Sequence, residues 1–223
     1  MVVMLRKSIL ILSVVVSSYA TFAQTKSYIE GMRAYRKMYV DSHEVVKNGD
    51  KQYMHFFAID PGFRVTSNFT PAKNAKWFAM KTSGTETQTY RKYGVLTFKI
   101  HDTTVRLTVY QSQSLMTSTD YADYLFIPFT DNTSGNESYG GGRYLDYKIS
   151  DIKNNKLLLD FNKAYNPYCA YTTGYNCPIP PAENDLKVAI RAGEKAFEKK
   201  QKGTARGILE GYKIRRKDKE PQE

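Results

Sequence analysis

A succession of short segments rich in Val, Phe, Tyr and Thr constrains the fold of this chain more than any other feature. Turns containing Gly, Asn, Asp and Pro separate these segments, and no helical pattern lies between them. The segments predicted as strands are residues 53–59, 62–69, 76–82, 86–93, 95–101, 104–111, 124–129, 143–149, 156–162 and 185–191. Such an order predicts a mainly β protein, an antiparallel β-barrel or β-sandwich, rather than a parallel α/β sheet.

One helix is expected before the strands. In residues 27–40 the apolar side chains recur at three- and four-residue intervals among charged ones, which is typical of an amphipathic helix. Hydrophobic residues make up 41% of the chain and aromatic residues 13%, which is enough apolar surface for a packed core. This composition excludes an intrinsically disordered protein.

The first residues have the pattern of a secretory signal. Basic residues precede an apolar run from Ile9 to Val16, and small residues follow it up to Ala23. The run is far shorter than the ~20 residues of a membrane span. We therefore expect a signal peptide over residues 1–23 and a periplasmic or secreted protein with no transmembrane segment after cleavage. No Cys stands at the cleavage position, which argues against a lipid anchor.

The formal charge of +11 is concentrated at the ends of the chain. Residues 195–219 hold ten Lys or Arg and three Glu or Asp, with few large apolar side chains. We expect residues 195–223 to form a flexible basic tail, either a solvated arm or a contact to an anionic surface of the cell envelope. Export argues against nucleic acid as the partner.

Cys169 and Cys177 are the chain's two cysteines. In an oxidising compartment such a close pair is expected to form a disulfide. A catalytic thiol is the alternative, but no His lies near either Cys in sequence to act as its base. Two Cys without a matching His pair make a poor zinc site.

The strongest local pattern begins at Phe126 and ends near Glu194. The residues that carry it are Asp131, Gly135, Tyr139, Gly140, Gly142 to Asp146, Asp160 to Asn162, Tyr165 to Pro167, Cys169, Tyr171, Cys177, Pro178, Pro180, Pro181, Glu183, Asn184, Leu186 and Ala192 to Glu194. This block resembles that of the DUF1684 family of exported bacterial proteins of unknown function. The resemblance implies export and a single-domain body, here residues 24–194, but no substrate and no catalytic residue.

Two loops within this block suggest anion or metal binding. Gly140 to Gly142 could cradle an anion, but a strand-like segment follows instead of a helix with a Lys-Ser/Thr pair, which favours a turn. Asp131 to Asn136 is rich in oxygen ligands, yet lacks the alternating acidic ligands and the distal Glu of a calcium-binding EF-hand loop. The sequence leaves metal binding open.

The aromatic and proline-rich loop of residues 165–181 is the best candidate for a ligand contact, because a disulfide would hold it in place. Covering one end of a barrel is the alternative role for its tyrosines. Glu183 and Asn184, just after the loop, could face a ligand or form a turn. The candidate ligand-binding residues are Asp131, Tyr139, Arg143, Tyr144, Asp146, Asp160, Asn162, Tyr165, Asn166, Tyr171, Glu183 and Asn184.

Segments 143–149 and 156–162 are predicted to pair as a hairpin whose apolar residues share one face. That register places Asp146 opposite Asp160 on the other face. Opposed carboxylates repel, so a cation, a neighbouring Arg or a shared proton would have to accompany them at the floor of a polar site. An exposed pair screened by water is the alternative.

These observations favour a noncatalytic exported β-domain that binds a small polar ligand or glycan between the strand ends and the loop of residues 165–181. A hydrolase using paired carboxylates is the first alternative, since two acidic groups can act as acid and base without His. An envelope scaffold that makes contact through its basic tail is the second. No cofactor is expected, and the sequence leaves open whether the protein is an enzyme.

Overall fold

The computed structural model describes residues 24–199, which fall into two compact units divided between Ser42 and His43. The predicted signal peptide, residues 1–23, and the part of the predicted tail from residue 200 onward lie outside the described residues. In the first unit one helix spans residues 24–42 and contains the amphipathic helix predicted over 27–40. Its last turn is closed by the Ser42 hydroxyl, which donates to the Met38 carbonyl at 2.8 Å.

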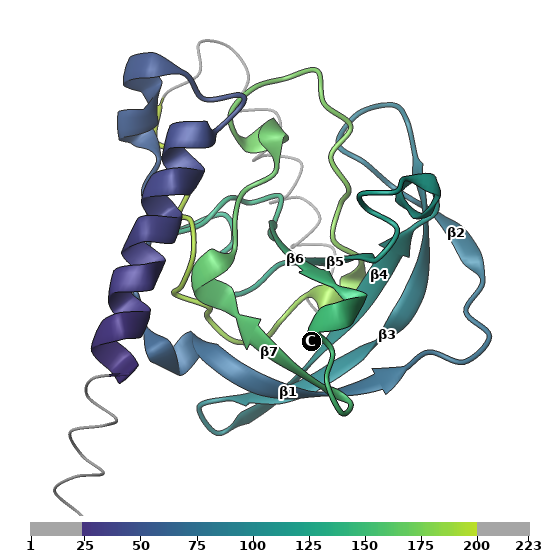
Figure 1. The fold of residues 1–223 in the computed structure, drawn as a ribbon. Helices are drawn as coiled ribbons and strands as arrows, with labels where there is room; N and C mark the ends of the chain where they lie inside the picture. The colour runs from purple at the N-terminus through teal and green to yellow at the C-terminus, as the bar shows by residue number, and fades with distance from the viewer. Residues whose placement is uncertain (1–23, 200–223) are drawn as a thin grey trace, which may run out of the picture. The chain divides into compact units, whose positions relative to one another are not determined.

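The second unit is a seven-stranded antiparallel sheet that curls into a half-barrel (Figure 1). The strands are β1 (Arg64–Pro71), β2 (Trp77–Met80), β3 (Gln88–Ile100), β4 (Thr103–Ser112), β5 (Tyr124–Phe129), β6 (Arg143–Lys148) and β7 (Lys156–Asp160). They lie in the order β6-β5-β4-β3-β1-β7, and β2 also pairs with β3. The expected mainly β, antiparallel architecture is confirmed.

Short 3₁₀ helices lie between and after the strands. They are η1 (Asn48–Tyr53), η2 (Pro61–Phe63), η3 (Leu115–Thr117), η4 (Ile149–Asp151), η5 (Phe161–Lys163), η6 (Tyr168–Ala170) and η7 (Ala182–Asn184). None of the helices described in residues 24–199 is long and apolar enough to cross a membrane.

The sheet buries side chains on both of its faces. Successive side chains of a strand point to opposite faces, so Leu125 and Ile127 of β5 enter the main core, whereas Phe126 enters a second cluster. The main core is aliphatic and aromatic, with Leu96, Leu107, Leu145, Leu157 and Leu159 at its centre. The second cluster consists of Met80, Tyr90, Tyr110, Phe126 and Tyr144, with Phe78, Tyr124 and Tyr165 packed against it. We call the face that carries this second cluster the tyrosine face.

The longest element is the hairpin of β3 and β4. The predicted strands 86–93 and 95–101 form the single strand β3, whose register with β4 shifts between Lys92 and Gly94. His101 and Asp102 form the turn between β3 and β4, with His101 at φ 49° in the left-handed region.

Two predicted strands are absent. Segment 53–59 begins in η1 and continues with a single bridge, Phe56 to Glu194. Segment 185–191 has the alternation of a strand because Leu186 and Ile190 fill the main core, but it pairs with Thr130 only at one bridge. Alternating burial therefore does not require a strand partner in this segment.

The predicted hairpin of 143–149 with 156–162 is also wrong. β6 pairs with β5, which places Asp146 opposite Phe126, and β7 pairs with β1, which places Asp160 opposite Arg64. Apolar matching did not select the partners here, because the apolar strand β5 pairs with β6, whereas β7 pairs with the mostly polar strand β1. These two edge strands are linked instead by the hydroxyl of Tyr147, which accepts from the Asp160 amide at 2.8 Å.

Candidate functional site

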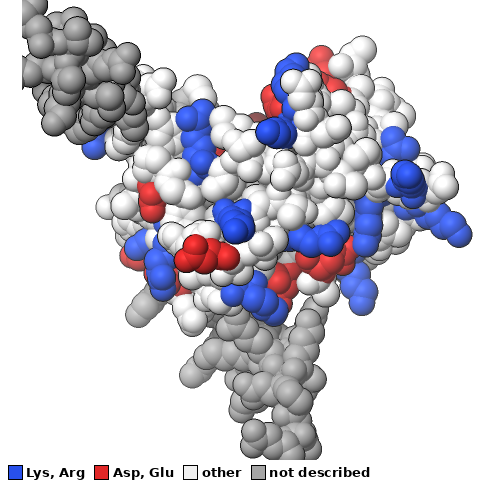
Figure 2. Space-filling view, turned by 90° about the horizontal axis from the view of Figure 1, so that it is seen from below, with Lys and Arg blue, Asp and Glu red and all other residues white. Residues whose placement is uncertain are grey.

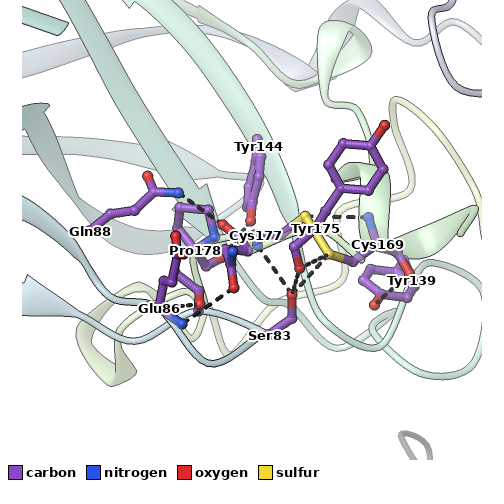
Figure 3. The surroundings of a disulfide bond; sticks show 11 residues. Ser83, Glu86, Gln88, Tyr139, Tyr144, Cys169, Tyr175, Cys177 and Pro178 are labelled. Carbon is purple, nitrogen blue, oxygen red and sulfur yellow. Dashed lines mark hydrogen bonds between the residues drawn. A yellow bond between two sulfur atoms is a disulfide. The ribbon is translucent and has the colours of Figure 1, made fainter. Parts of the chain in front are cut away.

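The loop of residues 165–181 is closed by an internal disulfide and is held at the tyrosine face by backbone and side-chain hydrogen bonds. Cys169 and Cys177 are joined, with their Cα atoms 6.3 Å apart, as predicted. Figure 3 shows Ser83 beside this disulfide, where its hydroxyl lies 2.8 Å from the Cys169 sulfur and accepts from the Cys177 amide at 3.1 Å. The loop also bridges to Thr82 at Pro178.

Tyr144 of β6 fixes both ends of this loop. Its amide donates to the Tyr165 carbonyl at 2.9 Å, and its carbonyl accepts from the Tyr165 amide at 3.1 Å. Its hydroxyl donates to the carbonyl of Pro178. The segment before the disulfide and the segment after it are thus both anchored on one side chain and its backbone.

Asp146 lies next to this anchor, two residues along β6 and on the same face. Its Oδ1 accepts from the Tyr124 hydroxyl at 2.6 Å, and its Oδ2 accepts from the Tyr165 hydroxyl at 2.7 Å. The residue is exposed to solvent. A carboxylate that solvent can reach is therefore oriented by two tyrosines, one from β5 and one from the loop.

The surroundings of Asp146 affect its protonation. Desolvation by the surrounding protein raises the pKa of Asp146, and the hydrogen bonds from Tyr124 and Tyr165 only partly offset this. Burial, together with the charge of Asp146, raises the pKa of Tyr90 to about 12 and raises the pKa values of Tyr124 and Tyr165 well above their usual range. These tyrosines therefore keep their protons at neutral pH and act as hydrogen-bond donors.

Glu183 is a second carboxylate near the tyrosine face, but it is already paired. The Lys92 ammonium lies 2.7 Å from its Oε1, and the Tyr110 hydroxyl donates to the same oxygen at 2.9 Å. Partial burial opposes ionisation of Glu183, yet the hydrogen bonds from Lys92 and Tyr110 hold its pKa below the usual value. The two carboxylates differ in that Glu183 has a cation beside it.

Asp131 and Arg143 form a buried ion pair on the opposite, main-core face. The Arg143 Nη2 lies 2.6 Å from Asp131 Oδ2, and both side chains are 0% exposed. The guanidinium also donates to the carbonyls of Ile190, Ala192 and Glu194. Arg143 thus binds Asp131 and three backbone carbonyls of residues 190–194, and the pair is structural.

The loops around this pair are turns, as the sequence favoured. Gly142 has φ +89°, and a Cβ there would lie 2.6 Å from the Phe129 carbonyl oxygen. The Asp131 carboxylate, which a calcium site in this loop would need as a ligand, instead binds Arg143 and accepts from the Thr133 hydroxyl.

Asn184 is fully buried, and its side chain forms hydrogen bonds with the backbone of β4 and β5. Its Oδ1 accepts from the Thr108 amide at 2.7 Å, and its Nδ2 donates to the carbonyls of Thr108 and Pro128 at 2.9 and 2.7 Å. Pro128 has no N–H to give to the sheet, and the Asn184 amide supplies the missing donor. This amide is therefore unavailable to a ligand.

The remaining predicted residues lie in three other places. Asn162 exchanges hydrogen bonds with the backbone of Asp60, and Asp160 accepts from the Asn162 amide. Asn166 and Tyr171 both donate to the buried carboxylate of Glu194, at 2.9 and 2.6 Å. The Tyr139 hydroxyl donates to the Cys169 carbonyl at 3.4 Å. The twelve predicted residues therefore do not form one site, and Tyr144, Asp146 and Tyr165 are the ones gathered at the open carboxylate.

The family model described as "Protein of unknown function (DUF1684)" matches residues 52–195, more than half of the chain. The chain belongs to the DUF1684 family. The solution NMR structure of the uncharacterized protein from gene locus rrnAC0354 of Haloarcula marismortui is similar to this DUF1684 chain, with 28% identity and a TM-score of 0.59. The similarity covers 79% of this chain and 98% of that one. No curated protein matches.

Sequence reasoning missed Tyr124 and Tyr90 of this DUF1684 domain. Both lie in segments predicted as strands, and the run 124–129 is apolar at nearly every position. An apolar run with a Tyr on one face of the strand is a signal that both faces are covered. Within residues 24–199, no cluster of three or more His, Cys, Asp or Glu side chains is placed to hold a metal ion.

Proposed function

We propose that this DUF1684 domain is a noncatalytic binding domain that takes a small polar ligand or glycan at the Asp146 carboxylate. The observation that carries the proposal is the arrangement of the carboxylate, which Tyr124 and Tyr165 orient and which solvent reaches although the surrounding protein partly desolvates it. A carboxylate has about four acceptor positions, and the two tyrosines use two of them. Positions for donors from a ligand remain, beside a stapled loop that can supply further contacts.

Export is part of this proposal. The signal-like pattern of residues 1–23 supports it, and a disulfide between Cys169 and Cys177 suits an oxidising compartment. We therefore place the ligand in the cell envelope or outside the cell.

The two alternatives have weaker support. The hydrolase alternative rested on Asp146 facing Asp160, and these residues pair with different strands. The scaffold alternative rests on the tail, most of which lies outside the described residues. On the face seen in Figure 2, some Lys and Arg side chains lie beside Asp and Glu, and others gather without acidic neighbours.

The experiment is a ligand screen by saturation-transfer NMR with mono- and disaccharides of envelope polymers, followed by titration of the hits. Asp146→Asn and Tyr165→Phe should each weaken binding at least tenfold, because each removes one of the groups that define the site. Asp102→Asn, a neutralised exposed carboxylate at the turn between β3 and β4, is the matched control and should bind as the parent does. Binding that survives in Asp146→Asn would contradict the proposal.

A further inference from the structure

We infer that the ligand carries a protonated primary amine and that this ammonium group binds the Asp146 carboxylate. The inference rests on the proposed function and narrows it from a polar ligand to a cationic one. An amino sugar is one compound of this class. Three features of the site, its charge, its acceptor positions and its aromatic lining, support the inference.

The first feature is an unbalanced negative charge. Among residues 24–199, Asp146 makes no ion pair, whereas Asp131 is paired with Arg143, Glu183 with Lys92 and Glu137 with Arg191. Lys148 follows on the same strand and face, but its ammonium lies 3.8 Å from Asp123. A carboxylate that is partly removed from water and lacks a cation binds a charged ligand more strongly than a neutral one.

The second feature is the pattern of acceptors. Each carboxylate oxygen of Asp146 accepts one tyrosine hydroxyl and retains one further acceptor position. The hydroxyls of Tyr124 and Tyr165 hold both carboxylate oxygens in place. A primary ammonium has three N–H donors and can bind both of these oxygens at once, whereas a ligand hydroxyl has one donor.

The third feature is the aromatic lining. Tyr165 packs edge-on against Tyr144 with ring centroids 5.8 Å apart, and Tyr124 packs against Tyr121 at 6.5 Å. Aromatic rings attract cations through their negative faces, so tyrosines beside the carboxylate favour a cationic ligand. The desolvation that raises the pKa of Asp146 is consistent with this lining.

The test compares glucosamine with N-acetylglucosamine, which share a sugar ring but differ in whether the amine is free or capped. Titrations by calorimetry at pH 6.5, where glucosamine is protonated, use the full chain and its Asp146→Asn and Asp102→Asn variants. The parent and Asp102→Asn should bind glucosamine at least tenfold more tightly than N-acetylglucosamine. Asp146→Asn should lose that preference. Raising NaCl from 50 to 500 mM should weaken glucosamine binding to the parent, because salt screens the ion pair.

The outcomes separate this inference from the proposed function. Equal binding of both sugars by the parent, lost in Asp146→Asn, would overturn the inference and leave the proposed function standing. A glucosamine preference that persists in Asp146→Asn would place the ammonium elsewhere and overturn the inference. Absence of binding to both sugars and to every saccharide of the screen would overturn the proposed function and the inference together.

Discussion

At the scale of single residues, two carboxylates of this domain have opposite surroundings. Asp131 is fully buried and neutralises Arg143, whereas Asp146 is exposed and has no cation beside it. Removing one partner of a buried ion pair leaves the other charge uncompensated, at a cost of about 3 to 5 kcal/mol. A partly desolvated carboxylate without a cation beside it tends instead to destabilise the fold. The two groups are therefore expected to respond in opposite directions to neutralisation.

Asp131→Asn should lower the free energy of unfolding by about 3 kcal/mol or more, because Arg143 keeps its charge and loses its nearest carboxylate. Urea denaturation followed by circular dichroism measures the loss. The control is Glu137→Gln, which breaks the exposed ion pair with Arg191 at 3.0 Å and should cost less than about 1 kcal/mol. Equal effects of the two substitutions would contradict a structural role for the buried pair.

Asp146→Asn should preserve or raise the melting temperature at pH 7, by at most a few degrees. The folded-state pKa of Asp146 lies above its ordinary value, so the ionised carboxylate destabilises the fold at neutral pH. That cost disappears as the pH falls through the raised pKa, since the folded chain then takes up the proton more readily than the unfolded one. Thermal unfolding measured between pH 7 and pH 4 should show the advantage of the variant shrinking towards the acid end. An advantage that grows towards pH 4 would contradict this assignment.

At the scale of elements, the junction of β4 and β5 depends on a side chain from η7. Thr108 and Pro128 lie opposite each other by the register of Tyr110 with Phe126, and Pro128 has no amide hydrogen to donate. Asn184 fills the gap with hydrogen bonds to both residues. A proline is thereby accommodated inside a sheet, where it would otherwise leave the Thr108 carbonyl unsatisfied.

Asn184→Ala should lower the free energy of unfolding by about 3 kcal/mol or more, because buried backbone groups of Thr108 and Pro128 lose their partners. Chemical denaturation measures the change. Asn68→Ala, at an exposed position of β1, is the matched control and should change stability by less than about 1 kcal/mol. A small loss of stability in Asn184→Ala would mean that β4 and β5 pair at this position without the Asn184 side chain.

The strands illustrate how far the sequence predicts this fold. The alternation of apolar and polar residues located β1 to β7 to within a few residues, because every second side chain of each strand is buried on one face of the sheet. It could not exclude segment 185–191, in which the Ile190 carbonyl accepts from the distant Arg143 side chain and the Val188 carbonyl accepts from the amide of Asn132, outside any strand. It also could not select the partner of β6, since any apolar strand satisfies the same pattern. Long-range pairing of this kind is not encoded in local spacing.

The candidate site was predicted only in part, because it too depends on long-range strand pairing. Asp146 and Tyr165 were identified from the resemblance block, and they do meet at one carboxylate. Tyr124 was hidden in an apolar strand, and the expected partner Asp160 lies on β7 at the other end of the sheet order. The residue types at the site were therefore predictable from the sequence, whereas which residues lie next to Asp146 depends on the order of the strands in the sheet.

At the scale of the whole molecule, the hydrogen-bonded body continues beyond Glu194. The amide of Lys195 donates to the His55 carbonyl at 2.8 Å, and the amide of Ala196 donates to the Glu137 carbonyl at 3.1 Å. The ring of Phe197 then packs against those of Tyr53 and Tyr171, with centroids 6.2 and 5.2 Å away. The first residues of the predicted tail thus add contacts to the body.

Two truncations should separate this docked segment from the rest of the tail. Removing everything after Gly203 should leave the melting temperature nearly unchanged, because residues 204–223 carry many charges and few large apolar side chains to bury. Removing everything after Lys195 should lower it by roughly 3 to 6 °C, because the half-buried Phe197 ring and the ion pair of Lys199 with Asp50 at 2.6 Å are lost. Differential scanning calorimetry of both truncated chains beside the parent measures the shifts. A fall of more than about 5 °C in the longer chain would show that residues 204–223 also dock on the body, since a segment that buries little surface cannot contribute that much.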